Sequence, residues 1–526
     1  MLLPDYIVIV LYFIVLILLS FFTFSSKWKN IFGTEKKTPW WIGGLSIFMI
    51  FTSIDSPQLY SGIIHKQGIW GLWLLWVGGI SAGVVPIIFA PLWAKLNFIT
   101  DNQFILFRFS GIGAKILHRF RAIYVGGLIV AFLLSFQVLA FSRVLMYYME
   151  VNSSIALLIS GGLLLIFSLK NTLSHKLKTD VLHAVIYFAS FIICIIFIVD
   201  KAGGWSGVIQ SAQVYFPEKL VIIPSAKDSS FLNTLLVYVT VLWWSAQMFD
   251  GGGQEAQRFF STRDRYQAIK AGLIAIIFRQ ASSILIIIVI IAGMTLETNS
   301  VTSLTRTEGA FVGYFYHHLP SGWKGLGLLG FFVAFISTAE SLLNWGSSFL
   351  MVDVYKKIIR NRTNRHYANM SFVIMFSLSL TGLLIAFLGN TLYDLIQILF
   401  SISAGVAPVF ILRWIWLRIN AWSQLSAMLA SVLFTLIFDL FSIDSFLDYL
   451  QLDIYALRIL FVTFFTTVTW LLVTFLTPKD DEIKLAEFRK LIPLNSFSLQ
   501  KILLALGVGV GFTASLALIV YVLINW

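Results

Sequence analysis

The hydrophobic residues of this chain fall into stretches that are long enough to cross a lipid bilayer. A transmembrane helix needs about 20 predominantly apolar residues, and such stretches follow one another along nearly the whole sequence. Only 12% of the 526 residues are charged, against about 25% in soluble domains, so the sequence predicts an all-α integral membrane protein. We expect about fourteen spans, at 5–25, 40–64, 68–97, 122–147, 153–169, 179–200, 231–256, 267–294, 322–352, 366–389, 392–418, 421–442, 455–477 and 500–524.

Basic residues collect in every second connection between these spans, and the intervening connections are short, balanced or acidic. Segment 439–454 carries four aspartates and no basic residue. By the positive-inside rule the basic connections are cytoplasmic, which places both chain termini outside. The net charge of +12 therefore reflects topology, and we expect no nucleic-acid partner. The basic set is Lys27, Lys29, Lys36, Lys37, Arg108, Lys115, Arg119, Arg121, Lys170, Lys176, Lys178, Arg258, Arg263, Arg265, Lys270, Lys356, Lys357, Arg360, Arg362, Arg365, Lys479, Lys484, Arg489 and Lys490.

The second span is interrupted by a proline within a polar cluster, in the sequence FTSIDSPQLYSG at 51–62. Pro57 removes a backbone donor, and Ser53, Asp55 and Gln58 lie close to it in sequence. An intramembrane aspartate costs roughly 2.5–3.5 kcal/mol on insertion scales, so it needs a partner or a wet cavity. The cluster predicts a broken helix at a polar site. An ordinary proline kink with an interfacial Asp55 is the alternative.

The seventh span carries a matching interruption, LWWSAQMFDGGGQEAQR at 242–258. Ser245, Gln247 and Asp250 precede three consecutive glycines, each of which destabilises a helix by about 1 kcal/mol relative to alanine. A glycine-rich phosphate loop does not fit, because no strand precedes the glycines and their spacing matches neither nucleotide fingerprint. Interrupted helices five spans apart begin two five-span blocks, which is the pattern of a transporter with inverted repeats.

Three further ionisable groups lie within predicted spans. Arg279 is far from either end of its span, and Asp180 opens the sixth span, where an interfacial helix cap is the alternative. Glu340 lies on a helix with a hydroxyl-bearing face, which helical spacing assigns to Ala334, Ser337, Thr338 and Ser341. Hydroxyls, backbone carbonyls and a nearby carboxylate suit a small hard cation. This face therefore predicts an ion site.

These segments resemble the sodium:solute symporter family over nearly the whole chain. ISTAESLLNWGSSFLMVDVYKK (336–357) looks like the family's ion-binding helix, and QEAQRFFSTRDRYQAIKAG (254–272) looks like the segment after its second broken helix. KTDVLHAV (178–185), TSIDSPQ (52–58) and RWIWLRINAWS (413–423) are similar to further segments found in the family or a branch of it. The resemblance implies a leucine-transporter-type fold with a 5+5 inverted repeat. It divides the chain into 1–39, an extra helix and a cytoplasmic loop, 40–230, the first repeat, 231–420, the second repeat, and 421–526, the flanking helices.

The resemblance also implies two sets of cation ligands. The main sodium site would use the backbone carbonyls of Phe51, Ile54 and Ala334 with the hydroxyls of Ser337 and Thr338. Some members have a second sodium site, and its positions hold Asp180, Glu340 and Ser341 here. Glu340 departs from the family pattern. Its carboxylate could strengthen a cation site, be protonated, or replace the second ion by a fixed charge, so this set is a candidate second cation or proton site.

By resemblance, the solute cavity lies between the two broken helices and the span that follows the second one. Its candidate residues are Asp55, Gln58, Ser245, Gln247 and Arg279. Gln58 matches a sugar-contacting glutamine of the family, and Arg279 falls where sugar-transporting members place a lysine. An arginine can hold a carboxylate with two hydrogen bonds, which suggests a carboxylate-bearing solute. In the alternative, Arg279 only pairs with Asp55 or Asp250 and neutralises them.

The predicted function is sodium-coupled import of a small polar solute across the cell membrane by alternating access. Sodium is the expected coupling ion, and no organic cofactor is expected. The alternatives are a proton-coupled transporter or exchanger, with Glu340 or Asp180 as the relay, and a transporter-like solute sensor. An enzyme is not expected, because His317 and His318 lack metal-ligand spacing such as H-E-x-x-H and no nucleophile–base pair is evident.

Overall fold

The structure is a computed structural model. It describes residues 1–21, 32, 36–168, 173–223, 229–245, 250–297, 304–389, 391–440 and 453–525. These residues form α, 3-10 and π helices and no β-strand, apart from an isolated bridge between Thr38 and Thr262. The predicted all-α class is confirmed for this part of the chain.

Ten helical segments of the described chain are long and apolar enough to cross a membrane. Each of them falls on a predicted span. The other predicted spans coincide with shorter apolar helices, at Leu3–Leu16, Trp40–Phe51, Ser153–Ile166 and Phe231–Thr240. The protein is therefore a multi-pass membrane protein, and the number of fourteen crossings stays a prediction.

The described helices follow one another along the whole chain, and the division into an extra helix, two repeats and flanking helices stays a prediction. The chain begins with α1 (Leu3–Phe21), α3 (Trp40–Phe51), α4 (Asp55–Gln67), η1 (Ile69–Leu72), α5 (Trp73–Trp76), α6 (Gly78–Val84), η2 (Val85–Phe89), α7 (Ala90–Trp93), α8 (Gln103–Arg108), α9 (Gly111–Ile123), η3 (Tyr124–Ile129), α10 (Val130–Met149), α11 (Ser153–Ser168) and α12 (Leu173–Lys201). It continues with α13 (Gly204–Tyr215), η4 (Pro217–Leu220), α14 (Ser229–Thr240), η5 (Leu242–Trp244), α15 (Gln254–Ser261), α16 (Arg265–Leu296), α17 (Leu304–His318), α18 (Trp323–Ser348), η6 (Phe349–Tyr355), α19 (Lys356–Ile358), α20 (Asn364–Ala386) and α21 (Leu392–Leu412). The last elements are α22 (Ala421–Leu440), α24 (Ile454–Leu476), α25 (Glu482–Leu491), η7 (Leu494–Phe497) and α26 (Leu499–Asn525).

The first broken helix is divided between α3 and α4. Thr52 ends α3 with φ −89° and ψ 60°, outside the helical region, and Asp55 begins α4. Pro57 lies in the first turn of α4, where a backbone N–H has no partner within the helix. The proline therefore lies at the start of a new helix and does not kink a continuous one, so the ordinary proline kink is wrong.

The second broken helix is divided between α14 and α15. Gly251 and Gly253 have φ angles of 66° and 67°, in the left-handed region that glycine adopts without steric cost. A Cβ atom on Gly251 would lie 2.6 Å from Cγ1 of Val85. The glycines thus provide both the backbone conformation and the space that this break requires.

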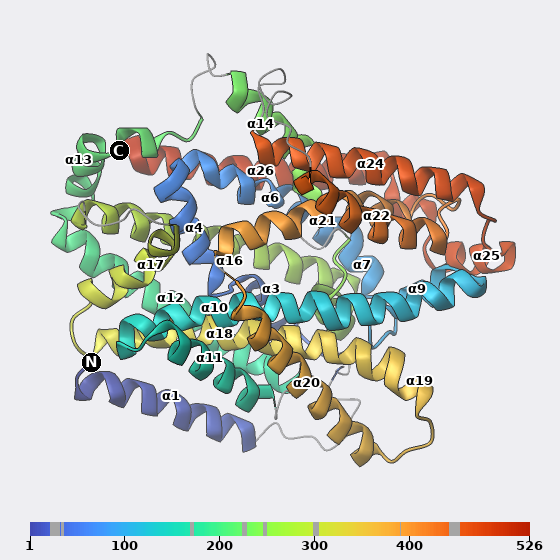
Figure 1. The fold of residues 1–526 in the computed structure, drawn as a ribbon, viewed down its shortest axis with the longest axis horizontal. Coiled ribbons are helices and arrows are strands. Elements are labelled where there is room, and N and C mark those ends of the chain that lie inside the picture. The colour runs from blue at the N-terminus through green and yellow to red at the C-terminus, as the bar shows by residue number, and fades with distance from the viewer. Residues whose placement is uncertain are drawn as a thin grey trace.

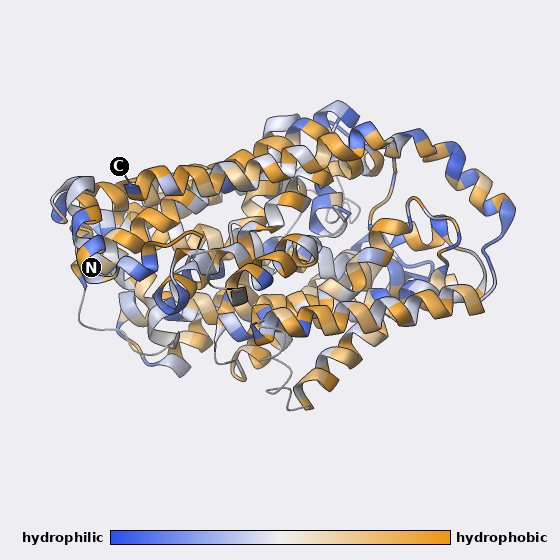
Figure 2. Cartoon of the chain, turned by 90° about the horizontal axis from the view of Figure 1, so that it is seen from above, coloured by the Kyte–Doolittle hydropathy of each residue, from blue (hydrophilic) through white to orange (hydrophobic). Residues whose placement is uncertain are grey.

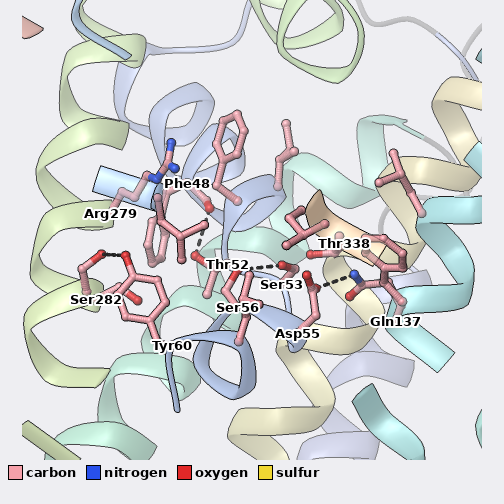
Figure 3. A pocket seen from close by; sticks show the side chains of 18 of the residues that line it. Phe48, Thr52, Ser53, Asp55, Ser56, Tyr60, Gln137, Arg279, Ser282 and Thr338 are labelled. Carbon is pink, nitrogen blue, oxygen red and sulfur yellow. Dashed lines mark hydrogen bonds between the residues drawn. The ribbon is translucent and has the colours of Figure 1, made fainter. Parts of the chain in front are cut away.

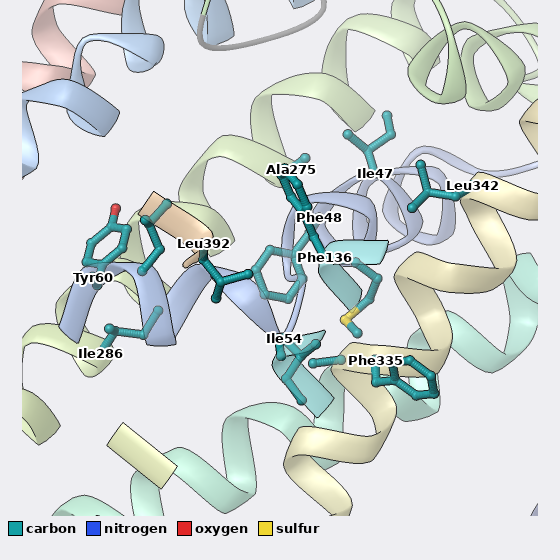
Figure 4. Packing of buried hydrophobic residues seen from close by; sticks show 14 of the residues in the cluster. Ile47, Phe48, Ile54, Tyr60, Phe136, Ala275, Ile286, Phe335, Leu342 and Leu392 are labelled. Atoms are coloured by element: carbon teal, nitrogen blue, oxygen red, sulfur yellow. The ribbon is translucent and has the colours of Figure 1, made fainter. Parts of the chain in front are cut away.

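Apolar side chains from both blocks pack around the first break (Figure 4). Phe48 stacks on Phe188 of α12 with ring centroids 5.3 Å apart, and Phe335 of α18 stacks on Phe141 of α10 at 4.5 Å. These contacts hold α3, α10, α12 and α18 together. On the outside, large side chains such as Leu388 and Leu476 are more than 80% exposed, and Figure 2 shows hydrophobic residues along the outer helices. An apolar outer surface of this kind fits a lipid environment.

Both chain termini lie at one end of the helical bundle, and α9, α19 and α25 lie toward the other end (Figure 1). Those three helices carry eight of the 24 residues of the basic set, including Arg119, Lys356 and Lys490. The charge segregation expected from the sequence is therefore present in space. The assignment of the basic end to the cytoplasm stays a prediction.

We expect the orientation to be measurable by cysteine labelling. The single cysteine, Cys194, is fully buried, so it should contribute little background. Leu2→Cys should react with a membrane-impermeant maleimide in intact cells, and Glu482→Cys should react only after permeabilisation, because the positive-inside rule places the termini outside and α25 inside. The reverse labelling pattern would contradict the predicted orientation.

We also expect that the contact between α6 and α26 leaves no space for a Cβ atom at Gly509. A Cβ on Gly509 would lie 2.3 Å from the carbonyl oxygen of Ile80, whereas a Cβ on Gly507 would meet nothing within 4 Å. Gly509→Ala should therefore be less stable than Gly507→Ala by about 1–3 kcal/mol, the usual cost of overpacking. Thermal unfolding of the two variants in detergent measures this difference, and equal midpoints would refute the contact.

Candidate functional site

A cavity of about 230 Å³ lies against the first helix break (Figure 3). Its walls come from the end of α3, the break itself and the start of α4, with α10, α12, α15, α16, α18 and α21 around them. Phe48, Phe136 and Phe400 make part of the lining apolar. A small cavity that combines apolar walls with polar and charged side chains beside a broken helix is the arrangement expected of a solute site.

One side of the cavity carries a carboxylate. Asp55 accepts a hydrogen bond of 2.7 Å from Nε2 of Gln137 on α10, and the neighbouring hydroxyls of Ser53 and Ser56 lie 3.0 Å apart. Asp55 forms no ion pair with any residue that the structure describes. As the first residue of α4, its negative charge is favoured by the positive end of the helix dipole.

The other side of the cavity carries a guanidinium (Figure 3). The Cζ atom of Arg279 lies 5.1 Å from the centroid of the Phe51 ring, within cation–π distance. Within the described parts of the chain Arg279 has no hydrogen bond or ion pair, and its Nη1 atom is buried without a partner. Asp55 binds Gln137, and Asp250 binds Arg413 at 2.6 Å. The alternative that Arg279 neutralises Asp55 or Asp250 is therefore wrong.

Glu255 is a cavity residue that we did not single out from the sequence. It lies in the first turn of α15, directly after the glycine break, and it lines the cavity together with Arg279. The two side chains are not within ion-pair distance. A charged residue two positions after three helix-breaking glycines was the available signal.

A buried cluster centred on Asp180 lies beside the α18 hydroxyl face. The Oδ1 atom of Asp180 accepts from Nζ of Lys176 at 2.8 Å and from Oγ of Ser337 at 2.5 Å. Its Oδ2 atom accepts from Oγ of Ser46 at 2.5 Å. Asp180 is fully buried within α12, so the alternative of an interfacial helix cap is wrong.

Arg258 completes this cluster from the second broken helix. Its Nη2 atom donates to Oγ of Ser341 at 2.8 Å, and its Nε atom donates to Oγ of Ser46 at 3.3 Å. The Oε2 atom of Glu340 lies 4.0 Å from Nζ of Lys176. We call Lys176, Asp180, Ser46, Arg258, Ser337, Ser341 and Glu340 the Asp180 cluster. It joins α3, α12, α15 and α18.

Two members of the cluster correct the sequence interpretation. The sequence pattern assigns Lys176 and Arg258 to basic connections on the cytoplasmic side. In the structure the Lys176 side chain is 1% exposed and Arg258 is fully buried. Each binds within the helical bundle, to Asp180 and to Ser341 respectively, because α3 packs against α12 and α18 and α15 packs against α3 and α18.

The residues expected at the main sodium site lie where α18 meets the first break. Oγ1 of Thr338 lies 3.4 Å from the carbonyl oxygen of Met49, in the last turn of α3, and both Thr338 and Phe51 line the cavity. Ile54 and Ala334 are also buried. Hydroxyl and carbonyl oxygens at one junction are suitable donors for a small hard cation.

The other predicted solute residues are placed differently. Gln58 is fully buried and lies outside the cavity lining, because its amide donates to the Ala140 carbonyl at 2.8 Å and accepts from Arg143 at 3.3 Å. Ser245 also lies outside the lining, since its hydroxyl donates to the Leu242 carbonyl of its own turn at 2.8 Å. Gln247 lies outside the described residues.

The segment RWIWLRINAWS fixes the second break. Arg413 and Nε1 of Trp414 both donate to Oδ2 of Asp250, at 2.6 and 2.7 Å. Nε1 of Trp93 donates to the Asp250 backbone carbonyl at 2.6 Å. Asn420 caps the following helix by accepting from the backbone N–H of Trp422 at 2.9 Å. The segment thus anchors the glycine-rich break to the end of α21.

The fold and the site define a multi-pass membrane transporter in which two interrupted helices border a polar cavity. The family model described as the sodium:solute symporter family matches residues 32–431. The chain belongs to this family, whose members carry out sodium-coupled symport.

Individual relatives are distant in sequence, but their alignments cover most of this chain. The chain is 21% identical over 443 residues to the "Sodium/glucose cotransporter" of Vibrio parahaemolyticus, covering 78% of this chain and 79% of that protein. It is 22% identical over 423 residues to the "Sodium/sialic acid symporter NanT" of Aliivibrio fischeri, covering 75% and 79%. A solved structure of a substrate-bound, outward-open Na+-coupled sialic acid symporter matches with a TM-score of 0.71 at 15% identity, over 91% of this chain and 99% of that one. The structural match shows the fold.

We expect Asp250→Asn to destabilise the protein strongly. Arg413 is fully buried, and removing its partner leaves an uncompensated charge, which costs about 3–5 kcal/mol. The double variant Asp250→Asn/Arg413→Gln should recover part of this loss. Thermal unfolding in detergent provides the measurement, with the exposed Asp200→Asn as the control. If Asp250→Asn unfolded like Asp200→Asn, the ion pair would have no structural role.

Proposed function

We propose that this protein is a sodium-coupled symporter that imports a small, carboxylate-bearing polar solute. The observation that carries the proposal is Arg279, a guanidinium at the cavity wall that has no ion pair among the described residues. An unpaired charge in a membrane interior is expensive, and such groups usually belong to a substrate pathway. A solute carboxylate would supply the missing partner.

The proposed solute lies across the cavity between its two charged sides. Its carboxylate binds Arg279 with two parallel hydrogen bonds, which the planar guanidinium favours. Hydrogen-bond donors at the other end of the solute face Asp55, which Gln137 orients. The volume of about 230 Å³ is below that of typical sites for drug-sized ligands, which suits a small metabolite.

Sodium is proposed to bind next to the solute, through the carbonyls of Phe51, Ile54 and Ala334 and the hydroxyls of Ser337 and Thr338. Because Phe51 and Thr338 also line the cavity, the ion and the solute both contact the broken helix. Binding of either one orders this helix and so favours binding of the other. The two repeats, 40–230 and 231–420, then rock around this site. Each sodium entering a negative-inside cell contributes about 2.3 kcal/mol per 100 mV.

A proton-coupled transporter or exchanger is the second candidate. The observation that favours it is Glu340, whose carboxylate lies 4.0 Å from Nζ of Lys176 within a membrane-spanning helix. Intramembrane carboxylates of this kind serve as proton relays in transporters. Uptake into vesicles with only a sodium gradient or only a proton gradient separates the two functions.

We expect a thermal-shift screen to find small carboxylates that stabilise the purified protein only when sodium is present. Arg279→Gln should weaken that stabilisation about 10- to 100-fold in ligand concentration, because a charge-assisted hydrogen bond is worth about 1.5–3 kcal/mol. Arg279→Lys should retain part of it.

The exposed Arg265→Gln on the same helix provides the matched control and should bind like the unmodified protein. A panel of sugars and nucleosides should give no shift. A neutral solute that stabilised both the unmodified protein and Arg279→Gln equally would overturn the carboxylate assignment.

A further inference from the structure

We propose that the ammonium group of Lys176 takes the place of a second coupling cation, so that the protein binds one sodium ion where a two-site member would bind two. The inference deepens the proposed function and rests on it. It concerns the Asp180 cluster, whose Asp180, Glu340 and Ser341 occupy the positions of the second cation set.

The ammonium group of Lys176 lies among oxygen atoms of the kind that would coordinate a bound cation. Nζ of Lys176 lies 2.8 Å from Oδ1 of Asp180, 3.0 Å from Oγ of Ser337 and 4.0 Å from Oε2 of Glu340. These oxygens come from two helices, α12 and α18, and the ammonium is 1% exposed between them. An ammonium carries three donors and no acceptor, so it satisfies the same hard oxygen ligands that a sodium ion would require.

The remaining ligands of this set are also engaged. Ser341 accepts from Arg258 at 2.8 Å and donates to the Ser337 carbonyl at 3.0 Å. Oδ2 of Asp180 accepts from Ser46 at 2.5 Å. A sodium ion entering here would have to displace one tethered cation and face another, so the residues present do not fit a second sodium.

The formal charges lead to the same conclusion. With all groups ionised, Lys176 and Arg258 balance Asp180 and Glu340, so the cluster is neutral without any added ion. A further cation would leave one uncompensated positive charge in a region of low dielectric, which is unfavourable. Removing the ammonium alone leaves one negative charge and a space bounded by carboxylate and hydroxyl oxygens.

The main sodium site is compatible with this arrangement. The Ser337 hydroxyl donates to Asp180 and accepts from Lys176, which leaves one of its two lone pairs for a sodium ion. Lys176 is covalently held on α12 and cannot be released into the cell. It therefore fills the second position without contributing to the driving force, and each solute is imported with one sodium ion.

The test counts sodium ions bound to the purified full-length protein, using radioactive ²²Na+ as the probe and choline chloride to keep the ionic strength constant. We expect one ion per unmodified protein and two per Lys176→Ala protein. Lys178→Ala is the matched control, because Lys178 is exposed on the same helix, and it should bind one ion. Lys176→Ala/Asp180→Asn should also bind one, since the second ion needs the Asp180 carboxylate.

The melting temperature of Lys176→Ala should in addition rise more steeply with sodium chloride than that of the unmodified protein, because the ion replaces the lost ammonium. A purely structural ion pair would give lower stability without an extra bound ion. Folded Lys176→Ala with the same ion count as the unmodified protein would overturn the inference, as would two ions in the unmodified protein. If Lys176→Ala did not fold, the number of sodium ions bound to the unmodified protein would test the inference: one ion would support it and two would overturn it.

The two proposals fail in different ways. The inference depends on the difference between Lys176→Ala and the unmodified protein, whereas sodium coupling depends on the absolute count. No ion in the unmodified protein and one in Lys176→Ala would support the replacement of a cation by Lys176, but it would refute sodium coupling and the count of one bound ion. No ion in either protein would refute both.

Discussion

The buried carboxylate of Asp180 is the interaction on which the arrangement of both broken helices depends. It accepts hydrogen bonds from α3 through Ser46 and from α18 through Ser337, and Ser46 in turn accepts from Arg258 on α15. An isolated carboxylate would be very costly at this depth, and the cost is offset only while all these partners are in place. One half of each interrupted helix, α3 in the first and α15 in the second, is therefore positioned by one charge, and a movement of either half changes the hydrogen bonds of the other.

Further buried ion pairs join helices elsewhere in the bundle. Toward the end with the chain termini, Arg143 of α10 binds Glu308 of α17 at 2.6 Å, and Glu308 also accepts from the backbone N–H groups that begin α21. Toward the basic end, Arg121 of α9 binds Asp101 at 2.7 Å, and Asp101 accepts from Nε1 of Trp345. In the proposed alternating access, the pairs at one end would separate while those at the other stay formed. Gln58 belongs to the first group through Arg143, which explains its absence from the cavity wall.

The sequence predicted what depends on composition and backbone chemistry. Hydrophobic length located the helices, and Pro57 and the three glycines located the breaks, because these residues restrict or free the backbone wherever they occur. It did not reveal which face each polar side chain presents. Lys176 was counted among loop charges because hydropathy does not distinguish a lysine that reaches water from one that turns inward to an aspartate four residues later. That i,i+4 spacing was the available signal, and only the packing of α3 and α18 against α12 shows that the pair is buried.

The charges around the cavity suggest why the proposed ion and solute would bind together. The second half of each broken helix carries a carboxylate in its first turn, Asp55 in α4 and Glu255 in α15, and Arg279 supplies one positive charge. With these groups ionised the cavity has a formal charge of −1, so an anionic solute alone would add to an existing negative excess. A sodium ion at the first break reduces that excess, and the solute makes the site more favourable for sodium by the same free energy, since binding linkage is reciprocal. In the proposed mechanism the coupling is therefore electrostatic, and it acts where α3 ends and α4 begins.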